Sequence, residues 1–328
     1  MKYFLRLWVY FSLVIVMSCS PREQTGTTKR FSAQGKRPDK YFLIAALGSN
    51  SYFYDHKLGL RLAGEFFGVE TEYKGPSDLN MQAVIQAIEL AVAQNPGGIM
   101  VVGFEESLND AVNKAVDAGI PVVTLDSDLP NSKRVAFIGT GNYDAGYLGG
   151  KTLGRLLHGK GKVAVMTKVG QSNLEERVRG YKDALATYPG IELVRIGDTK
   201  SDITLSAQVA SSIISAIPDL AGFGCVESSG VACAVALKEG GLVGKVKVVS
   251  MDRDADTLMY IKNGIIDATV VQQTALMPLY GLMVLYQLNH CDVPVTSSNS
   301  AAGASGVPRI IDTGMILVDK TNCDYFMR

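Results

Sequence analysis

The chain has 328 residues, 47% of them hydrophobic, and its 32 lysines and arginines balance its 32 aspartates and glutamates. This length exceeds a single typical core and predicts two lobes of ordinary domain size. The neutral balance argues against a nucleic-acid-binding protein, which needs a basic face. It also argues against a polybasic patch that would hold the chain on a membrane surface.

Residues 1–18 have the layout of a secretory signal peptide. Lys2 and Arg6 form a short positive region, and residues 7–17 are almost wholly apolar. This apolar run is shorter than the ~20 residues of a standard membrane-spanning helix. A tilted anchor helix that is never cleaved is the alternative interpretation.

The end of this segment, Val16-Met17-Ser18-Cys19, resembles a bacterial lipobox, with Val where Leu is commoner. The resemblance implies cleavage before Cys19 and a thioether-linked diacylglycerol on its thiol. Acylation of this kind would hold the protein at a membrane face without a helix crossing it. Residues 19–39 are polar and lack an apolar period, so we expect a disordered tether between lipid and fold. The predicted location is therefore exported and lipid-anchored, on the periplasmic or cell-surface side.

Four more cysteines follow, at Cys225, Cys233, Cys291 and Cys323. No pair among them has zinc-finger spacing. Disulfides form in exported proteins, and Cys291 with Cys323 would be the better pair. We nevertheless expect four thiols that are buried or free.

From residue 41 the chain alternates short apolar runs with helical patterns. The first half predicts strands at 41–47, 98–102, 120–125 and 135–138, and helices at 57–67, 79–94 and 108–118. The second half predicts strands at 161–167, 191–196, 220–226, 245–251 and 268–271, and helices at 173–188, 205–216 and 231–239. This alternation gives βαβ units and parallel sheets that are buried on both faces.

The two halves repeat one another. The segment 119–126 (GIPVVTLD) parallels 245–252 (KVKVVSMD), and each ends a buried strand on an aspartate, Asp126 or Asp252. Such a repeat implies two similar lobes. Ligands bind beyond the carboxyl ends of strands in open parallel sheets, so we expect one aspartate from each lobe at a ligand site.

Several ordered segments resemble a periplasmic sugar-binding protein of the ribose-receptor type, from about residue 41 to the end. They are Asn50-Ser-Tyr-Phe53, 119–126, Arg177-Val-Arg-Gly-Tyr181, 248–252 and 267–273. The resemblance implies an α/β fold of two Rossmann-like lobes, with parallel sheets flanked by helices. Three hinge crossings join the lobes, and we place them near residues 140, 272 and 313. Lobe one is predicted at 40–140 and 273–313, and lobe two at 141–272 and 314–328.

The resemblance also implies a ligand site in the cleft between the lobes. Its hydrogen-bonding positions are Asn50, Asp126, Arg177, Asp252 and Gln272, and its aromatic pair is Tyr52 and Phe53. Carboxylates and guanidinium groups engage two ligand hydroxyls at once, and an aromatic face covers the apolar side of a sugar ring.

A second set of candidates is Phe104, Ser127, Ser201 and Glu227. Ser127 stands where ribose and glucose receptors often carry an arginine, and Ser201 where an aromatic residue is common. Val226 stands where an asparagine is common. These departures leave the identity of the sugar open.

Each candidate also has an ordinary structural explanation. The two aspartates and Glu227 could cap helices, and Arg177 could form a surface ion pair with the acids beside it. The aromatic pair could belong to the core. Asn50 could be a turn residue, and Gln272 could lie on a solvated crossing.

No sequence motif supports catalysis, a metal or a cofactor. Gly139-Thr-Gly141 would need a third glycine at position 144, where Asp144 stands. His56, His158 and His290 are far apart in the sequence. We therefore predict a receptor, not an enzyme, that captures a monosaccharide or related polyol and delivers it to the permease of an ABC importer.

Two alternatives for the receptor remain, a ligand sensor for a signalling partner and a binder of a non-sugar polar solute. A transcription regulator would need a helix-turn-helix before residue 41, and the signal sequence occupies that place. We therefore expect no nucleic-acid partner.

Overall fold

The computed structural model describes residues 38–48, 51–291 and 293–327. The predicted signal peptide, Cys19, nearly all of the predicted tether and Asn50 lie outside the described residues. None of the helices in these described ranges has the length and apolar character needed to span a membrane.

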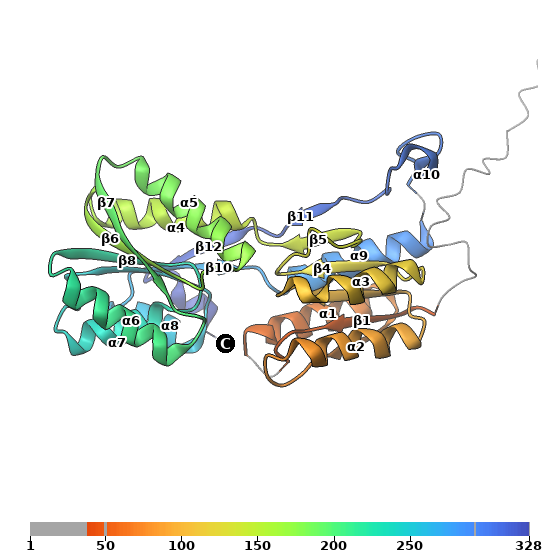
Figure 1. The fold of residues 1–328 in the computed structure, drawn as a ribbon, viewed down its shortest axis with the longest axis horizontal. Helices are drawn as coiled ribbons and strands as arrows, with labels where there is room; N and C mark the ends of the chain where they lie inside the picture. Colours follow the sequence, from red (N-terminus) through yellow and green to blue (C-terminus); the bar gives the residue numbers. More distant parts are fainter. Residues whose placement is uncertain (1–37, 49–50, 292, 328) are drawn as a thin grey trace, which may run out of the picture.

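Two six-stranded sheets form the centres of two lobes (Figure 1). In lobe one the strand order is β11 (Ile310–Asp312), β5 (Ala136–Gly139), β4 (Val122–Leu125), β3 (Gly98–Val102), β1 (Lys40–Ile44) and β2 (Glu70–Lys74). In lobe two it is β12 (Met315–Asp319), β10 (Ala268–Gln272), β9 (Lys247–Met251), β8 (Leu220–Cys225), β6 (Lys160–Thr167) and β7 (Gly190–Asp198). Neighbouring strands are parallel except β12, which runs antiparallel to β10.

The chain passes between the two sheets three times, after β5, after β10 and after β11. The three connections run side by side between the lobes in Figure 1. The predicted fold class, two α/β lobes joined by three crossings, is confirmed. The residue at which each lobe begins and ends stays a prediction.

Helices cover both faces of the lobe-one sheet, because successive residues of its buried strands point to opposite sides. Tyr41 and Leu43 of β1 pack with α1 (Tyr54–Phe67) and α9 (Leu276–His290). Phe42 and Ile44 pack with α2 (Met81–Ala93) and α3 (Asn109–Asp117) on the other face.

Lobe two is built in the same way. One face of its sheet packs with α4 (Asn142–Leu156) and α5 (Ser172–Ala186). The other packs with α6 (Ile203–Ala216), α7 (Gly230–Glu239) and α8 (Ala255–Lys262). The remaining short elements are η1 (Ser51–Phe53), η2 (Glu106–Leu108), α10 (Asn299–Ala302) and η3 (Cys323–Phe326).

The four described cysteines are free thiols. Cys291 is exposed at the end of α9 in lobe one, whereas Cys323 is buried in lobe two. Cys225 and Cys233 are both buried, with their sulfurs 3.8 Å apart. The expectation of buried or free thiols is confirmed.

Candidate ligand-binding site

Asp126 and Asp252 occupy equivalent places in the two lobes. Each directly follows a central strand, β4 or β9, and each has a left-handed backbone with φ of 65° or 68°. The N–H of Asp126 donates to the carbonyl of Ile138 at 3.0 Å, and that of Asp252 to the carbonyl of Val270 at 2.9 Å. Aspartate is among the few residues besides glycine that adopt this conformation readily. The repeat seen in the sequence is therefore also a repeat in backbone geometry.

Neither aspartate caps a helix. The side chain of Asp254 caps α8 by accepting from the N–H of Thr257 at 2.8 Å. In the other lobe, Asp128 accepts from the N–H of Leu129 and from Arg134. The second acid of each pair thus has the structural role, which leaves Asp126 and Asp252 for the junction between the lobes.

A chain of hydrogen bonds joins the two aspartates across that junction. The Tyr52 hydroxyl donates to Asp126 Oδ1 at 2.7 Å. Gln272 Nε2 donates both to the Tyr52 oxygen and to Asp252 Oδ1, each at 2.9 Å. Tyr52 belongs to lobe one and Gln272 ends β10 in lobe two, so the chain bridges the lobes. Gln272 is buried rather than solvated.

Arg177 fixes Gln272 from the other side. Its Nη2 donates to Gln272 Oε1 at 2.9 Å, its Nη1 to the carbonyl of Val226 at 3.0 Å, and its Nε to Asn142 Oδ1 at 2.8 Å. Only 3% of Arg177 is exposed, whereas its neighbours Glu176 and Arg179 pair with each other on the surface. Arg177 is therefore a buried donor at the junction and not a surface ion pair.

These groups influence one another electrostatically. Burial raises the pKa of Asp126, opposed by the Tyr52 hydrogen bond and by the positive charge of Arg177. Burial also raises the pKa of Asp252, opposed first by Arg177. The pKa of Tyr52 lies well above its usual value, first because the phenol is buried and then because both carboxylates face it. The phenol is thus a neutral donor throughout the physiological range.

A second polar group lies beside Asp252. The hydroxyls of Thr199 and Ser201 both donate to Glu227, with Ser201 at 2.5 Å from Oε2. Ser228 donates to Asp252 Oδ2 at 3.0 Å. Glu227 does not cap α7, whose first turn has no side-chain cap. The structure thus brings Ser201 and Glu227 together, and Glu227 is next in the sequence to Ser228, which contacts Asp252.

The predicted aromatic residues lie together in lobe one. The rings of Tyr52 and Phe53 meet edge to face at 5.1 Å, and Phe104 lies 6.2 Å from Phe53. Phe53 is buried in the core, while Tyr52 and Phe104 are partly buried. Ser127 is buried, and its hydroxyl has no hydrogen-bond partner among the described residues.

Sequence reasoning missed four contributors to this site, among them Thr199, which donates to Glu227. Asn142 and Ser228 hold Arg177 and Asp252, and Val226 contributes only its backbone carbonyl. A backbone carbonyl leaves no signal in the sequence. The position of Asn142 directly after the first crossing was the available clue.

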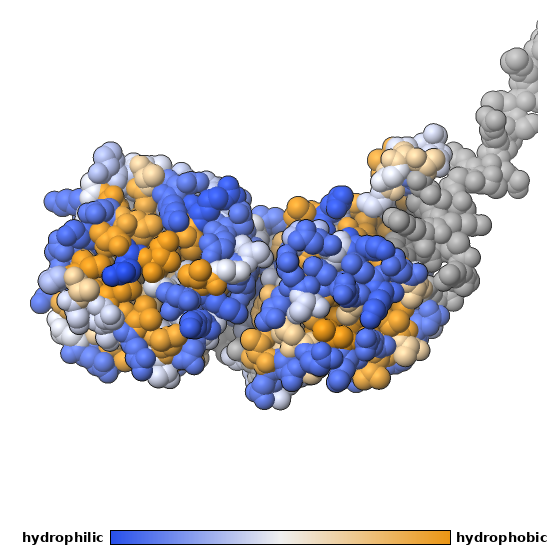
Figure 2. Space-filling view, viewed as in Figure 1, coloured by the Kyte–Doolittle hydropathy of each residue, from blue (hydrophilic) through white to orange (hydrophobic). Residues whose placement is uncertain are grey.

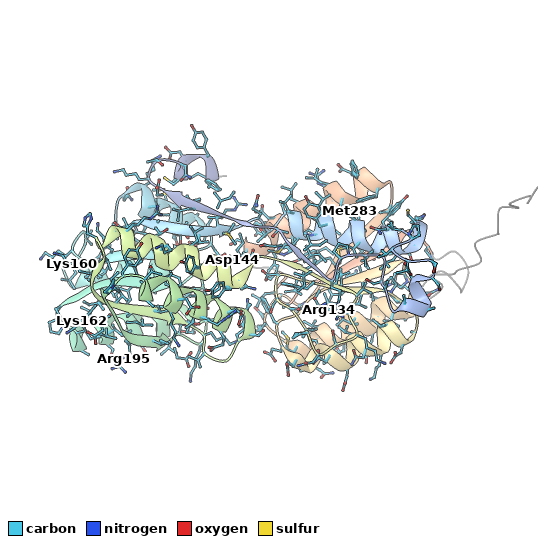
Figure 3. The ribbon with its side chains drawn as sticks, turned by 90° about the horizontal axis from the view of Figure 1, so that it is seen from above. Arg134, Asp144, Lys160, Lys162, Arg195 and Met283 are labelled. Carbon is cyan, nitrogen blue, oxygen red and sulfur yellow. The ribbon has the colours of Figure 1, made fainter. Side chains whose placement is uncertain are left out.

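Several basic side chains of lobe two lie away from the junction between the lobes. Lys160, Lys162 and Arg195 sit at the end of lobe two that is farthest from lobe one (Figure 3). Within the described ranges, no group of three or more His, Cys, Asp and Glu side chains could hold a metal ion.

This arrangement can recognise hydroxyl groups. Carboxylates accept from hydroxyls, and guanidinium and amide groups donate to them. Because the donors and acceptors come from both sheets, one solute could contact both lobes at once. Figure 2 shows the lobes as separate masses with a groove between them.

Comparison with known proteins gives consistent matches. The family model described as "Periplasmic binding protein domain" matches residues 41–290. The D-ribose/D-allose-binding protein of Pseudomonas aeruginosa is 26% identical over 76% of this chain and 78% of its own. The D-allose-binding periplasmic protein of Escherichia coli is 28% identical over 75% of this chain and 83% of its own.

Solved structures agree with these relatives. A sugar-binding protein of a sugar ABC transporter from Bacillus halodurans has a TM-score of 0.83 and 34% identity. An arabinose binding protein from Geobacillus stearothermophilus has a TM-score of 0.81 and 33% identity. Each match covers 88% of this chain and 99% of the solved chain.

Proposed function

The chain belongs to the periplasmic binding protein domain family, and we propose that it captures a monosaccharide or related polyol between its lobes for an ABC importer. The observation that carries the proposal is the hydrogen-bonded cluster of Asp126, Tyr52, Gln272, Asp252 and Arg177. It draws on both lobes at the carboxyl ends of their strands, where ligands bind in folds of this kind.

The similar proteins support an importer rather than a signalling protein as the partner. The B. halodurans structure is described as the sugar-binding protein of a sugar ABC transporter. A ligand that contacts both lobes stabilises the closed form. The permease subunits would then recognise that closed form. Family membership implies an extracytoplasmic location.

The protein acts by binding and not by catalysis. Its family is one of binding proteins. At the junction, Asp126 accepts a hydrogen bond from Tyr52, and Asp252 accepts hydrogen bonds from Gln272 and Ser228. In these contacts the carboxylates act as acceptors for hydroxyl and amide groups, which is the role that a polar ligand would also require.

A lipid anchor at Cys19 would keep the receptor close to its permease. Its support is the lipobox-like sequence that ends the apolar segment. Cys19→Ala should move the protein from the membrane fraction to the soluble fraction, or leave a precursor with the signal peptide attached. An unchanged mass together with an unchanged membrane fraction would contradict the anchor.

The ligand class is tested by thermal shift on purified protein lacking residues 1–18. Aldopentoses, aldohexoses and their polyols should raise the melting temperature, because a ligand that binds only the native state stabilises it by mass action. At ~100 times the dissociation constant, this amounts to about 2.7 kcal/mol. Shifts with amino acids or nucleosides but with no carbohydrate would refute the proposal.

A further inference from the structure

Two buried thiols of lobe two face one another in the core between β8 and α7. Cys225 is the last residue of β8 and is 1% exposed, and Cys233 lies in α7 and is fully buried. Their sulfur atoms are 3.8 Å apart, which is the distance of a hydrogen bond between thiols. The ligand cluster uses neither sulfur, so the contact needs an explanation of its own.

A small approach would join the two sulfur atoms. A disulfide bond is about 2.05 Å long, so the sulfurs would have to come closer by about 1.8 Å. The two side chains already point toward one another, and rotation of both side chains with a small shift of α7 would supply this distance. The other two described cysteines offer no such pair, because Cys291 lies in lobe one and Cys323 in lobe two.

The turn between β8 and α7, residues 226–229, carries contacts of the ligand cluster. The carbonyl of Val226 accepts from Arg177 at 3.0 Å, and the hydroxyl of Ser228 donates to Asp252 at 3.0 Å. The carboxylate between them accepts from two further hydroxyls. A covalent bond between the cysteines on either side would close this turn into a short loop and limit its movement.

We propose that Cys225 and Cys233 form a disulfide in the exported protein, and that this bond fastens the turn between β8 and α7. Disulfides form and persist outside the cytoplasm, and family membership implies an extracytoplasmic location. In the reaction each thiol loses its hydrogen and the two sulfurs join. The two electrons and two protons reduce the disulfide of an extracytoplasmic thiol oxidant to two thiols.

The bond forms before the native core closes over the sulfurs. A thiolate is the attacking form, and it must reach the oxidant. The pKa of Cys233 lies well above its usual range, first because of the hydrogen bond with Cys225 and then because of burial. Oxidation of the folded dithiol protein is therefore slow, and the exchange belongs to folding, before α7 packs against β8.

Trypsin gives a direct test, because it releases residues 201–238 as one peptide that contains both of these cysteines and no other. The full chain is exported from a bacterial cell, denatured with an alkylating agent but without reductant, and digested. The peptide 201–238 should be unlabelled and lighter than its dithiol form by two hydrogen atoms. Reduction before alkylation should place two labels on it.

Two controls show that the labelling is complete and specific. Cys323 is also buried, but its sulfur has no neighbouring thiol within bonding range among the described residues. Its tryptic peptide, residues 321–328, should therefore be labelled without reductant once the chain is denatured. The variant Cys233→Ala frees the remaining thiol, so its peptide 201–238 should gain one label under the same conditions.

Melting curves test whether the bond fastens the structure. Wild-type protein that is reduced in denaturant and refolded with reductant should melt lower than the oxidised protein by about 5 °C or more, because the cross-link no longer limits the unfolded chain. The double variant with Cys225→Ala and Cys233→Ala should melt at the same temperature with and without reductant. If that variant does not fold, the labelling of the wild type still decides whether the bond exists.

Three results would overturn the inference. Two labels on peptide 201–238 of the exported protein without reductant would show that both thiols are ordinary core side chains. A bond from either of them to Cys291 or Cys323 would show a different pairing. An equal melting temperature for the oxidised and reduced proteins would show that the bond fastens nothing. None of these measurements uses a ligand, so their outcome is independent of the proposed function.

Discussion

Asp126 and Asp252 show how one residue type can be selected for two reasons at once. A left-handed backbone follows each central strand, and aspartate tolerates that backbone better than most side chains do. The same side chain then presents a carboxylate to the junction between the lobes. An alanine at either position changes both properties, so an amide is the more informative replacement.

Asp252→Asn should weaken ligand binding but raise the stability of the ligand-free protein at neutral pH. Burial raises the pKa of Asp252, so the native state holds its proton more tightly than the unfolded state does. The free energy of unfolding therefore falls as pH rises through that pKa, and the amide removes the loss. Affinity should drop by about tenfold or more, because a ligand hydroxyl loses a charged acceptor. Calorimetry and melting curves from pH 4 to 8 would measure both effects.

Asp254→Ala is the contrasting variant. It removes the side-chain cap of α8 and should lower the free energy of unfolding by about 1 kcal/mol with near-normal affinity. If Asp252→Asn behaved in this way instead, Asp252 would have a structural role only.

His56 gives a pH dependence of the opposite sign. It is fully buried beside Tyr52 and Phe53, and neither ring nitrogen has a hydrogen-bond partner in the described structure. Burial lowers its pKa from 6.5 to about 4, with Asp55 acting weakly against this. Between these two values the unfolded state takes up a proton that the native state does not.

Stability should therefore fall as pH drops from 6.5 towards 4, by up to about 3 kcal/mol from this residue. His56→Phe should flatten that part of the stability curve, because phenylalanine fills a similar volume and does not titrate. Denaturant unfolding of both proteins at several pH values would measure the difference, and parallel curves would contradict the assignment.

The sequence pointed to several candidate residues that the structure brings to the junction of the lobes, but it did not predict their contacts. Duplication and resemblance pointed to Asp126 and Asp252, and the structure places both at the junction of the lobes. Nothing in the sequence indicated that Arg177 donates to Gln272 and to a backbone carbonyl rather than to an acid. Residues far apart in the chain come into contact only when both lobes have folded. Their spacing in the sequence therefore does not predict these contacts. Whether each candidate binds ligand stays a prediction.

At the scale of elements, α4 and α5 approach one another through glycines. A Cβ added to Gly146 in α4 would overlap the carbonyl oxygen of Arg177 in α5. A Cβ added to Gly180 would overlap the carbonyl of Tyr143 in the same way. This close packing lets Asn142, at the start of α4, reach the guanidinium of Arg177.

Gly146→Ala should therefore act on both stability and binding. Overpacking of this kind typically costs about 1–3 kcal/mol, and a displaced α5 would carry Arg177 away from Gln272. Gly240→Ala is the control, because its φ is −79° and an added Cβ would meet no atom closer than 3.3 Å. Denaturant unfolding and calorimetry on both variants would show whether the helix contact positions the arginine.

Strong apolar periodicity made the central strands predictable, whereas three of the four edge strands, β2, β11 and β12, and the helices α8 and α9 were not predicted. The strand β2 has the sequence Glu70-Thr-Glu-Tyr-Lys74, and Lys40 pairs with both of its glutamates. An edge strand that is half exposed can be this polar, so it lacks the apolar run that reveals central strands. The end of β1 also differs from the prediction. The strand ends at Ile44, whereas the apolar run that predicted it continues to residue 47, into the turn that follows.

At the scale of the whole molecule, a second contact bridges the lobes. Arg253 follows β9 in lobe two and forms an ion pair with Asp55 in α1 of lobe one. The exposed fraction of each of these two side chains is below one fifth. The hydroxyl of Thr274 also donates to Asp55 at 3.3 Å. Together with the Tyr52–Gln272 bond, this pair holds the lobes close to one another.

Asp55→Asn should therefore shift the ligand-free protein towards an open form. An interaction made only when the lobes are close stabilises the closed state, and its loss leaves more of the closure for the ligand to drive. We expect a larger radius of gyration in small-angle scattering without ligand. Affinity should fall by about 1 kcal/mol, or roughly fivefold, as for a partly exposed ion pair.

The charge-swapped pair, Asp55→Arg with Arg253→Asp, separates the lobe contact from any other effect of Asp55. It should recover part of the compaction that either single change loses, because the attraction between the lobes is restored with its sign reversed. Asp117→Asn is the control, since its partner Lys133 lies in the same lobe and the pair cannot report on closure. High salt should reduce the difference between wild type and Asp55→Asn, because partly exposed charges are screened. If the radius of gyration of Asp55→Asn matched that of the wild type at low salt, the ion pair would have no part in closing the lobes.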